Sequence, residues 1–375
     1  MISSSSKFLM RTILLSVASL IGADIIGEPG SFARDGQRQI FDEWLLELRQ
    51  EAMAEGIAAK TADAALRGIK RIPRVIELDR NQPEFKQTLA EYLRRIVSPQ
   101  KITKGRKMLL ENRSLLNDIS ERYGVRPRFL VALWGIESDF GRITGDFPTI
   151  AALVTLAYDS RRGSYFREEC LYALHILNEG LLSPDQMKGS WAGALGQLQF
   201  MPSVLYHFRV DYDGDGRIDL WNKSGDVFAS AAHYLIESGW DPDRTWGREV
   251  TLSSYFDREM TGLGFRKRLN EWQALGVRPK DVDRSSDQGA EGSIIVPDGS
   301  SDKAFIVYDN FQVLLKWNRS YNFAIAVGIL SDRIYESVPS ISNRKLSDHA
   351  ICSYPSTKNY KGGHDNSEIW SVSYQ

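Results

Sequence analysis

PRFLVALWGIESDFG, residues 127–141, is the stretch that indicates the fold most directly. Proline is favoured at a first helical position, because its missing N–H would have no intrahelical partner there, so a helix is expected to begin at Pro127. In that helix Glu137 shares a face with apolar residues one and two turns earlier, namely Leu130, Leu133 and Trp134. The stretch therefore predicts a helix that carries one carboxylate among apolar neighbours.

Such surroundings would give Glu137 a particular chemistry. Apolar neighbours disfavour the charged form of a carboxylate, which raises its affinity for a proton and suits it to act as a general acid near neutral pH. The alternative is an ordinary helical glutamate that caps the helix or pairs with an arginine such as Arg142. Asp139 lies two residues further on and points to another face, so no carboxylate pair is predicted on this helix.

Helical patterns continue on both sides of this stretch. Apolar residues recur at helical spacing, or lie between helix start and stop signals, in residues 40–53, 88–96, 104–123, 165–180 and 227–239. Strand-like composition follows only later, in GSIIVP (292–297), KAFIVY (303–308) and QVLLKW (312–317). The sequence predicts a mainly α protein of the α+β class, with a small β lobe near residues 290–318.

GSWAGALGQLQFMPS, residues 189–203, combines three kinds of residue. Its glycines allow close approach of the backbone to a ligand, its Ser and Gln side chains offer neutral hydrogen bonds, and its Trp and Phe rings offer flat apolar faces. This mixture suits a sugar, which has hydroxyls at its rim and C–H groups on its faces. A packed turn without a ligand is the alternative.

DYDGDGRIDLWN, residues 211–222, follows the spacing of an EF-hand loop. The pattern predicts carboxylate ligands from Asp211, Asp213, Asp215 and Asp219, and a backbone carbonyl ligand from Arg217. Position 12 is Asn222 instead of the usual glutamate, so a bound Ca²⁺ or Na⁺ would be held weakly and in a structural role. An acidic loop without metal is the alternative.

Length and composition fit an ordinary globular protein. The 375 residues are 42% hydrophobic and 25% charged, enough for one large domain or two to three lobes. Because 47 basic residues nearly balance 48 acidic ones, no broad field predicts a nucleic acid or an anionic membrane as partner. Cys170 and Cys352 show no metal-like or redox spacing, and we interpret them as unpaired, although an oxidising compartment would permit a disulfide.

Residues 1–33 resemble a secretory signal peptide. Lys7 and Arg11 precede an apolar run that ends at Ile26. Polar residues interrupt this run and it is short for a membrane span, so an uncleaved anchor is the weaker alternative. No cysteine follows it to carry a lipid, so we expect a soluble periplasmic protein whose polar tail, residues 338–375, is loosely ordered.

Taken together, these segments resemble the lytic murein transglycosylase B family from about Arg38 to Ser337. WGIESDFG resembles the catalytic block of that family, and Glu137 falls on its single acid/base. The second motif resembles the cleft motif of the family and places three residues on cleft positions, Ser190, Gln199 and Phe200. The acidic loop falls where the family has an EF-hand-like metal site.

Weaker matches extend the predicted substrate-binding site to six further residues: Tyr92, Arg161, Arg162, Tyr234, Trp317 and Asn318. Core packing of the aromatic residues and a solvated surface for the arginines are the alternatives. The resemblance implies a lysozyme-like core with an additional helical lobe and a small β lobe around a deep groove, all within residues 34–337. The region after Ser337 is too short and polar to match the separate wall-binding domain of some relatives.

The implied activity is cleavage of the β-1,4 bond between N-acetylmuramic acid and N-acetylglucosamine of peptidoglycan, with formation of a 1,6-anhydro end and no cofactor for the chemistry. A hydrolytic muramidase and a non-catalytic peptidoglycan-binding protein are the alternatives. A calcium sensor is not expected, because the second loop and the position-12 glutamate of such proteins are absent. The expected partners are glycan strands and wall-synthesis or remodelling proteins, and the expected state is a monomer.

Overall fold

The computed structural model describes residues 29–81, 87–159, 161–280, 289–297 and 303–336. Its contacts divide the chain into two units, Met1–Leu46 and Glu47–Gln375. The first unit is described only where helix α1 (Pro29–Ala54) begins. Most of the predicted leader, the predicted polar tail and Cys352 lie outside the described residues.

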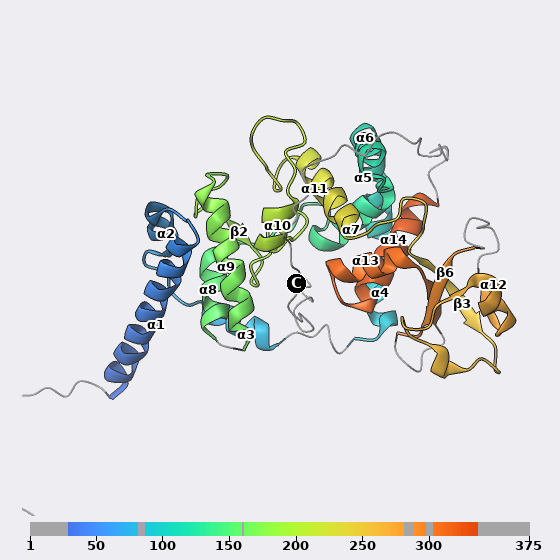
Figure 1. Ribbon diagram of the computed structural model, residues 1–375, viewed down its shortest axis with the longest axis horizontal. Coiled ribbons are helices and arrows are strands. Elements are labelled where there is room, and N and C mark those ends of the chain that lie inside the picture. Colours follow the sequence, from blue (N-terminus) through green and yellow to red (C-terminus); the bar gives the residue numbers. More distant parts are fainter. Residues whose placement is uncertain (1–28, 82–86, 160, 281–288, 298–302, 337–375) are drawn as a thin grey trace, which may run out of the picture. The chain divides into compact units, whose positions relative to one another are not determined.

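Helices form most of the second unit (Figure 1). After α1 they are α2 (Ala59–Leu66), α3 (Pro73–Arg80), α4 (Leu89–Ile96), α5 (Pro99–Glu111), α6 (Arg113–Tyr123), α7 (Pro127–Ser138), α8 (Thr149–Tyr158), α9 (Gly163–Asn178), α10 (Pro202–Phe208), α11 (Ser224–Glu237), the 3-10 turn η2 (Arg258–Met260), α12 (Leu269–Ala274), α13 (Asp309–Trp317) and α14 (Tyr321–Tyr335). The strands are β1 (Phe147–Pro148), β2 (Lys188–Gly189), β3 (Gly247–Leu252), β4 (Lys267–Arg268), β5 (Val277–Pro279), β6 (Glu291–Ile295) and β7 (Ala304–Val307). The predicted mainly helical class is confirmed.

Helix α7 lies inside the helical part of the molecule. It starts at Pro127 as predicted, ten of its 12 residues are buried, and it packs against α5, α6, α11 and α14. On α14, Asp332 accepts hydrogen bonds from Arg128 Nη1 of α7 at 2.7 Å and from Trp246 Nε1, which precedes β3, at 3.0 Å. These bonds fix the helix that carries Glu137 against its neighbours.

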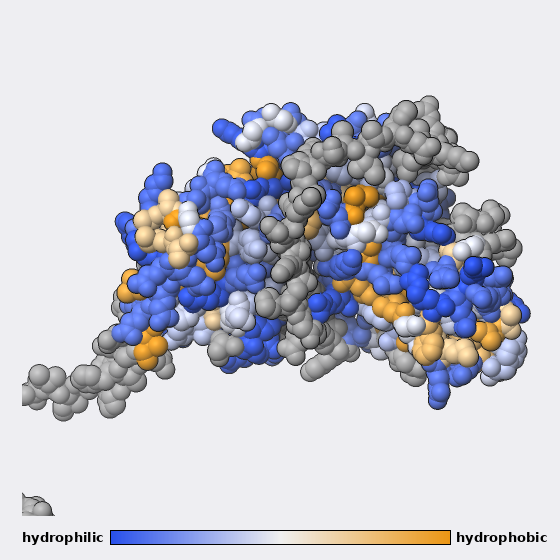
Figure 2. All heavy atoms as spheres, in the orientation of Figure 1, coloured by the Kyte–Doolittle hydropathy of each residue, from blue (hydrophilic) through white to orange (hydrophobic). Residues whose placement is uncertain are grey.

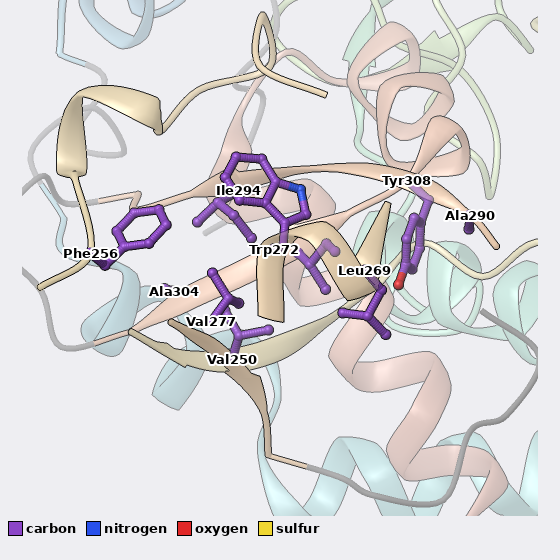
Figure 3. Packing of buried hydrophobic residues seen from close by; sticks show 10 residues of the cluster. Val250, Phe256, Leu269, Trp272, Val277, Ala290, Ile294, Ala304 and Tyr308 are labelled. Carbon is purple, nitrogen blue, oxygen red and sulfur yellow. The ribbon is translucent and has the colours of Figure 1, made fainter. Parts of the chain in front are cut away.

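A five-stranded antiparallel sheet in the order β4-β6-β7-β3-β5 forms the β lobe. Its core gathers around Trp272 of α12, as Figure 3 shows, and the indole Nε1 donates to the carbonyl of Gly292 at 2.9 Å. The lobe packs closely on α14 at Gly328, where a Cβ would lie 2.1 Å from the Trp246 ring. Only glycine leaves room for that contact.

The structure corrects three predictions. QVLLKW is not a strand but part of α13, whose buried residues Phe311, Leu314 and Trp317 recur at helical spacing. A segment of six residues is too short for its apolar pattern to distinguish a helical repeat from a strand repeat. The helix predicted over 104–123 is two helices, α5 and α6, because the chain breaks at Asn112, whose Nδ2 donates to the carbonyl of Met108. The sheet also begins earlier than residue 290, at β3.

Most of the surface visible in Figure 2 is hydrophilic, with separate apolar patches. Within the described residues, large hydrophobic side chains that are exposed include Leu110, Tyr255 and Phe265. None of the described helices combines the length and the apolar character needed to cross a membrane.

Candidate functional site

Glu137 is the penultimate residue of α7 and is 8% exposed. It lines a pocket with residues from four segments of the chain, Ala194, Gln199, Phe200, Met201, Val204, Tyr234, Trp317 and Asn318. Its Oε1 accepts a hydrogen bond from Trp317 Nε1 at 2.8 Å. The alternative partner, Arg142, donates instead to Asp139 Oδ2 at 2.6 Å. The single buried carboxylate predicted from the sequence therefore faces a pocket.

Burial raises the pKa of Glu137 to about 8. The hydrogen bond from Trp317 and the positive charge of Lys101 act in the opposite direction and favour the carboxylate. Lys101, on α5, donates from Nζ to the carbonyl of Gly135 at 2.9 Å. Desolvation outweighs both partners, so Glu137 is protonated at neutral pH and can donate a proton.

The chain turns sharply after Glu137. Asp139 and Phe140 have positive φ angles of 51° and 60°, an uncommon conformation for residues with a side chain. At Gly141, with φ of 77°, a Cβ would lie 2.2 Å from Gln197 Oε1. Gln197 also accepts from Trp134 Nε1 at 2.6 Å. This close approach joins the end of α7 to the glycine-rich segment of residues 189–203.

Three aromatic rings form one wall of the pocket. Trp317 lies 5.1 Å, between ring centroids, from both Phe200 and Tyr234. The Tyr234 hydroxyl donates to the carbonyl of Lys316 at 2.8 Å, which anchors the end of α13. The predicted cleft residues Phe200, Tyr234, Trp317 and Asn318 are thus brought together beside Glu137.

Gln199 supplies a fixed hydrogen-bond acceptor. Its Nε2 donates to the carbonyls of Thr144 at 3.0 Å and Gly196 at 2.7 Å, which settles the orientation of the amide. Its Oε1 is buried without a hydrogen-bond partner. Ser190, also predicted in the cleft, does not line this pocket; its Oγ accepts from the backbone of Ala192 and Ala194 and shapes the loop.

Three other predicted residues do not line the pocket with Glu137. Tyr92 is buried on α4, with the Arg95 guanidinium 5.6 Å from its ring centroid. Arg161 and Arg162 both pair with the buried Asp79 of α3. Arg162 is buried in this pairing, whereas half of the Arg161 side chain is exposed.

The acidic loop after α10 folds around its own carboxylates. Asp211 accepts from the backbone N–H groups of Gly214 at 2.9 Å and Gly216 at 2.8 Å. Asp219 accepts from the backbone N–H of Asn222, at 2.9 Å, and from its side-chain amide. In this structure Asn222 therefore stabilises the loop by donating hydrogen bonds to Asp219.

Two residues that the sequence analysis did not single out complete this loop. Asp226, buried on α11, accepts from the N–H groups of Tyr212 and Asp219, and its carboxylate lies with those of Asp211 and Asp213 within 4.8 Å. Lys223 Nζ donates to Asp213 at 2.8 Å and to Asp215 at 2.5 Å. A cation could take ligands from Asp211, Asp213 and Asp226, in competition with the Lys223 ammonium.

Residues 40–332, more than half of the chain, match the family described as "Transglycosylase SLT domain". The chain belongs to this family. The membership agrees with the resemblance expected from the motifs around Glu137 and residues 189–203, and makes the chain an enzyme of the lytic transglycosylase class.

Relatives of this transglycosylase with solved structures share its fold. SltB3 from Pseudomonas aeruginosa, in complex with NAG-anhNAM-pentapeptide, is 40% identical, with a TM-score of 0.74 over 78% of this chain and 79% of that one. Slt35 from Escherichia coli, in complex with calcium, is 26% identical, with a TM-score of 0.67 over 77% and 92% of the two chains. The predicted fold class is confirmed by these neighbours.

Membrane-bound lytic murein transglycosylase B from Escherichia coli is 28% identical to this transglycosylase over 246 residues. The match covers 65% of this chain and 66% of that protein. Sequence reasoning placed Glu137 and most of the pocket, but it assigned no function to Met201, Val204 or Ala194, which also line it. Ala194 and Met201 lie inside the motif of residues 189–203 and Val204 directly follows it, so this motif was the available signal.

Proposed function

We propose that this chain cleaves the β-1,4 bond between N-acetylmuramic acid and N-acetylglucosamine in peptidoglycan, leaving a 1,6-anhydro-muramic acid end. The observation that carries the proposal is one protonated carboxyl, Glu137, facing a pocket built from aromatic rings and a fixed amide. The family membership and the anhydro sugar ligand of the similar SltB3 structure support it.

In the first step Glu137 gives its proton to the oxygen that bridges the two sugars. The bond from that oxygen to the anomeric carbon breaks, the N-acetylglucosamine side leaves with its new hydroxyl, and positive character develops on the muramic acid carbon. No second carboxylate lines the described pocket, so the N-acetyl oxygen of the substrate is the internal stabiliser in this scheme, as in substrate-assisted glycosidases.

In the second step Glu137, now ionised, takes the proton from the 6-hydroxyl of muramic acid. The hydroxyl oxygen bonds to the anomeric carbon, which closes the 1,6-anhydro ring and returns Glu137 to its protonated form. An internal hydroxyl outcompetes water when it is held at the reacting carbon, because proximity is worth several kcal/mol. The Gln199 Oε1 acceptor is suited to hold a donor group of the sugar in this pocket.

Digestion of purified sacculi in heavy-oxygen water tests this function directly. We expect fragments that end in 1,6-anhydro-muramic acid, lighter by one water than reducing fragments, without label at the new end. Mass spectrometry distinguishes the two products. Labelled reducing ends as the main product would make the chain a muramidase, and no products at all would favour a peptidoglycan-binding protein.

Beyond the pocket, we keep Tyr92 and Arg161 as proposed contacts for more distant sugars. Arg161 supports this role because half of its side chain is exposed next to Asp79. For Ser190 and Arg162 the observed contacts support a role in shaping the loop and the α3 junction. An exported, periplasmic location belongs to the same proposal, because peptidoglycan lies there.

We also propose that the acidic loop binds a structural Ca²⁺ or Na⁺ through Asp211, Asp213 and Asp226. Carboxylate oxygens are the ligands that hard cations prefer, and the calcium complex of the similar Slt35 structure supports the choice of ion. The cation takes no part in the chemistry, because none of these residues lines the pocket of Glu137.

A further inference from the structure

The two oxygens of the Glu137 carboxyl are not equivalent. Oε1 accepts the Trp317 Nε1–H at 2.8 Å. An indole N–H can donate but never accept, whatever the protonation state of its partner. In a carboxylic acid the carbonyl oxygen is a better acceptor than the hydroxyl oxygen. The contact therefore favours the form of Glu137 in which Oε1 is the carbonyl.

Trp317 is held in place by groups other than Glu137. Its ring packs on Phe200 and edge-on against Tyr234, and the Tyr234 hydroxyl bonds to the carbonyl of Lys316, one residue before Trp317. The ring is only 6% exposed. Groups other than Glu137 thus fix the position of the donor, so the tryptophan orients the glutamate and not the reverse.

We propose that Trp317 is a positioning residue, which holds the transferable proton on Oε2 of Glu137 and stabilises the carboxylate that forms when this proton leaves. The proposal rests on the acid/base role of Glu137 stated above. It gives Trp317 a role in orienting Glu137, in addition to packing against the sugar as part of the cleft wall. When Oε2 loses its proton to the glycosidic oxygen, the bond to Oε1 becomes charge-assisted and strengthens.

Replacing Trp317 tests the proposal. Trp317→Phe keeps an aromatic ring between Phe200 and Tyr234 and removes the N–H. A bond that strengthens as charge develops acts mainly in the transition state, so we expect kcat to fall on the order of 10-fold or more with KM within about threefold. The basic limb of the kcat–pH profile should move upward by about one pH unit, because the lost donor favoured the ionised form.

A closer variant guards against loss of packing. 3-Benzothienylalanine at position 317 has the shape of tryptophan, with sulfur in place of the ring N–H, and should give the same shift. Trp240→Phe is the matched control, since Trp240 is buried against Phe129 outside the pocket, and its pH profile should match the wild type.

The outcomes separate clearly. If the benzothienyl protein has the wild-type kcat and basic limb, or if its loss is confined to KM, the positioning role is wrong and Trp317 is only a wall of the cleft. Neither result would contradict the proposed reaction, which is tested separately by replacing Glu137 and by identifying the anhydro product.

Discussion

At the scale of single residues, Glu137 and Glu169 are both buried carboxyls whose pKa is raised by burial, to about 8 and about 7. Their settings differ. Glu169, on α9, accepts from the backbone N–H and the hydroxyl of Ser203, at the start of α10, and does not line the pocket. A raised pKa alone would not have distinguished the proposed acid/base from a buried carboxyl that joins two helices.

Glu137→Gln should be folded and nearly inactive. The amide keeps the shape of the side chain and can still accept from Trp317, but it has no proton to transfer. General acid/base catalysis contributes about 100-fold or more, so turnover of sacculi should fall at least that far. Glu121→Gln, at an exposed position of α6, serves as control. A Glu137→Gln protein with more than about a tenth of wild-type turnover would contradict the assignment.

At the scale of elements, the acidic loop joins α10 to α11 through contacts made within the loop and with Asp226. The sequence pattern identified the loop and its first carboxylates, because the spacing of an EF-hand is local. It could not identify Asp226, which lies beyond the pattern and reaches the loop only because α11 packs behind it.

Added Ca²⁺ should raise the melting temperature, because an ion that binds only the folded state stabilises it by mass action. Differential scanning calorimetry with and without chelator measures the effect. Asp211→Asn should abolish it, while Asp185→Asn, an exposed change outside the loop, should not. Lys223→Gln should increase the apparent calcium affinity, because its ammonium competes for Asp213 and Asp215. A melting temperature that is indifferent to calcium and chelator would rule out the proposed site.

At the scale of the whole molecule, buried carboxyls make folding depend on pH. Glu137 and Glu169 have folded-state pKa values of about 8 and about 7, against an ordinary value of 4.5. The folded protein therefore binds more protons than the unfolded chain across this window. Their contribution to stability is complete below about pH 4.5 and is lost as pH rises to about 7 for Glu169 and about 8 for Glu137.

The free energy of unfolding should accordingly fall between about pH 4.5 and 8, on the order of a few kcal/mol per group. Urea unfolding at a series of pH values measures it. In Glu169→Gln the free energy of unfolding should fall less steeply with pH below about pH 7. In Glu137→Gln it should fall less steeply up to about pH 8. Wild-type slopes in both variants would show that these carboxyls are not perturbed as described.

Much of the molecule could be predicted from sequence because its signals are local. Pro127 starts α7, Gly124 ends α6 in the left-handed conformation with φ of 72°, and Thr88 with Glu91 caps α4. The prediction of a strand for QVLLKW was wrong because its apolar spacing fits both a strand and a helix, and tertiary packing decides between the two. The partner of Glu137 could not be predicted at all, since no pattern connects it to Trp317.

That partner lies 180 residues further along the chain. During synthesis, the ribosome completes α7 long before it reaches α13, so an emerging chain carries Glu137 without its donor and without the pocket wall. Contacts between residues so far apart in sequence form late, because closing a long loop costs chain entropy before the contact stabilises the fold. Until then the carboxyl is solvated and ionised like any surface glutamate, and the proposed acid forms only after α13 has been synthesised and has brought Trp317 to Glu137.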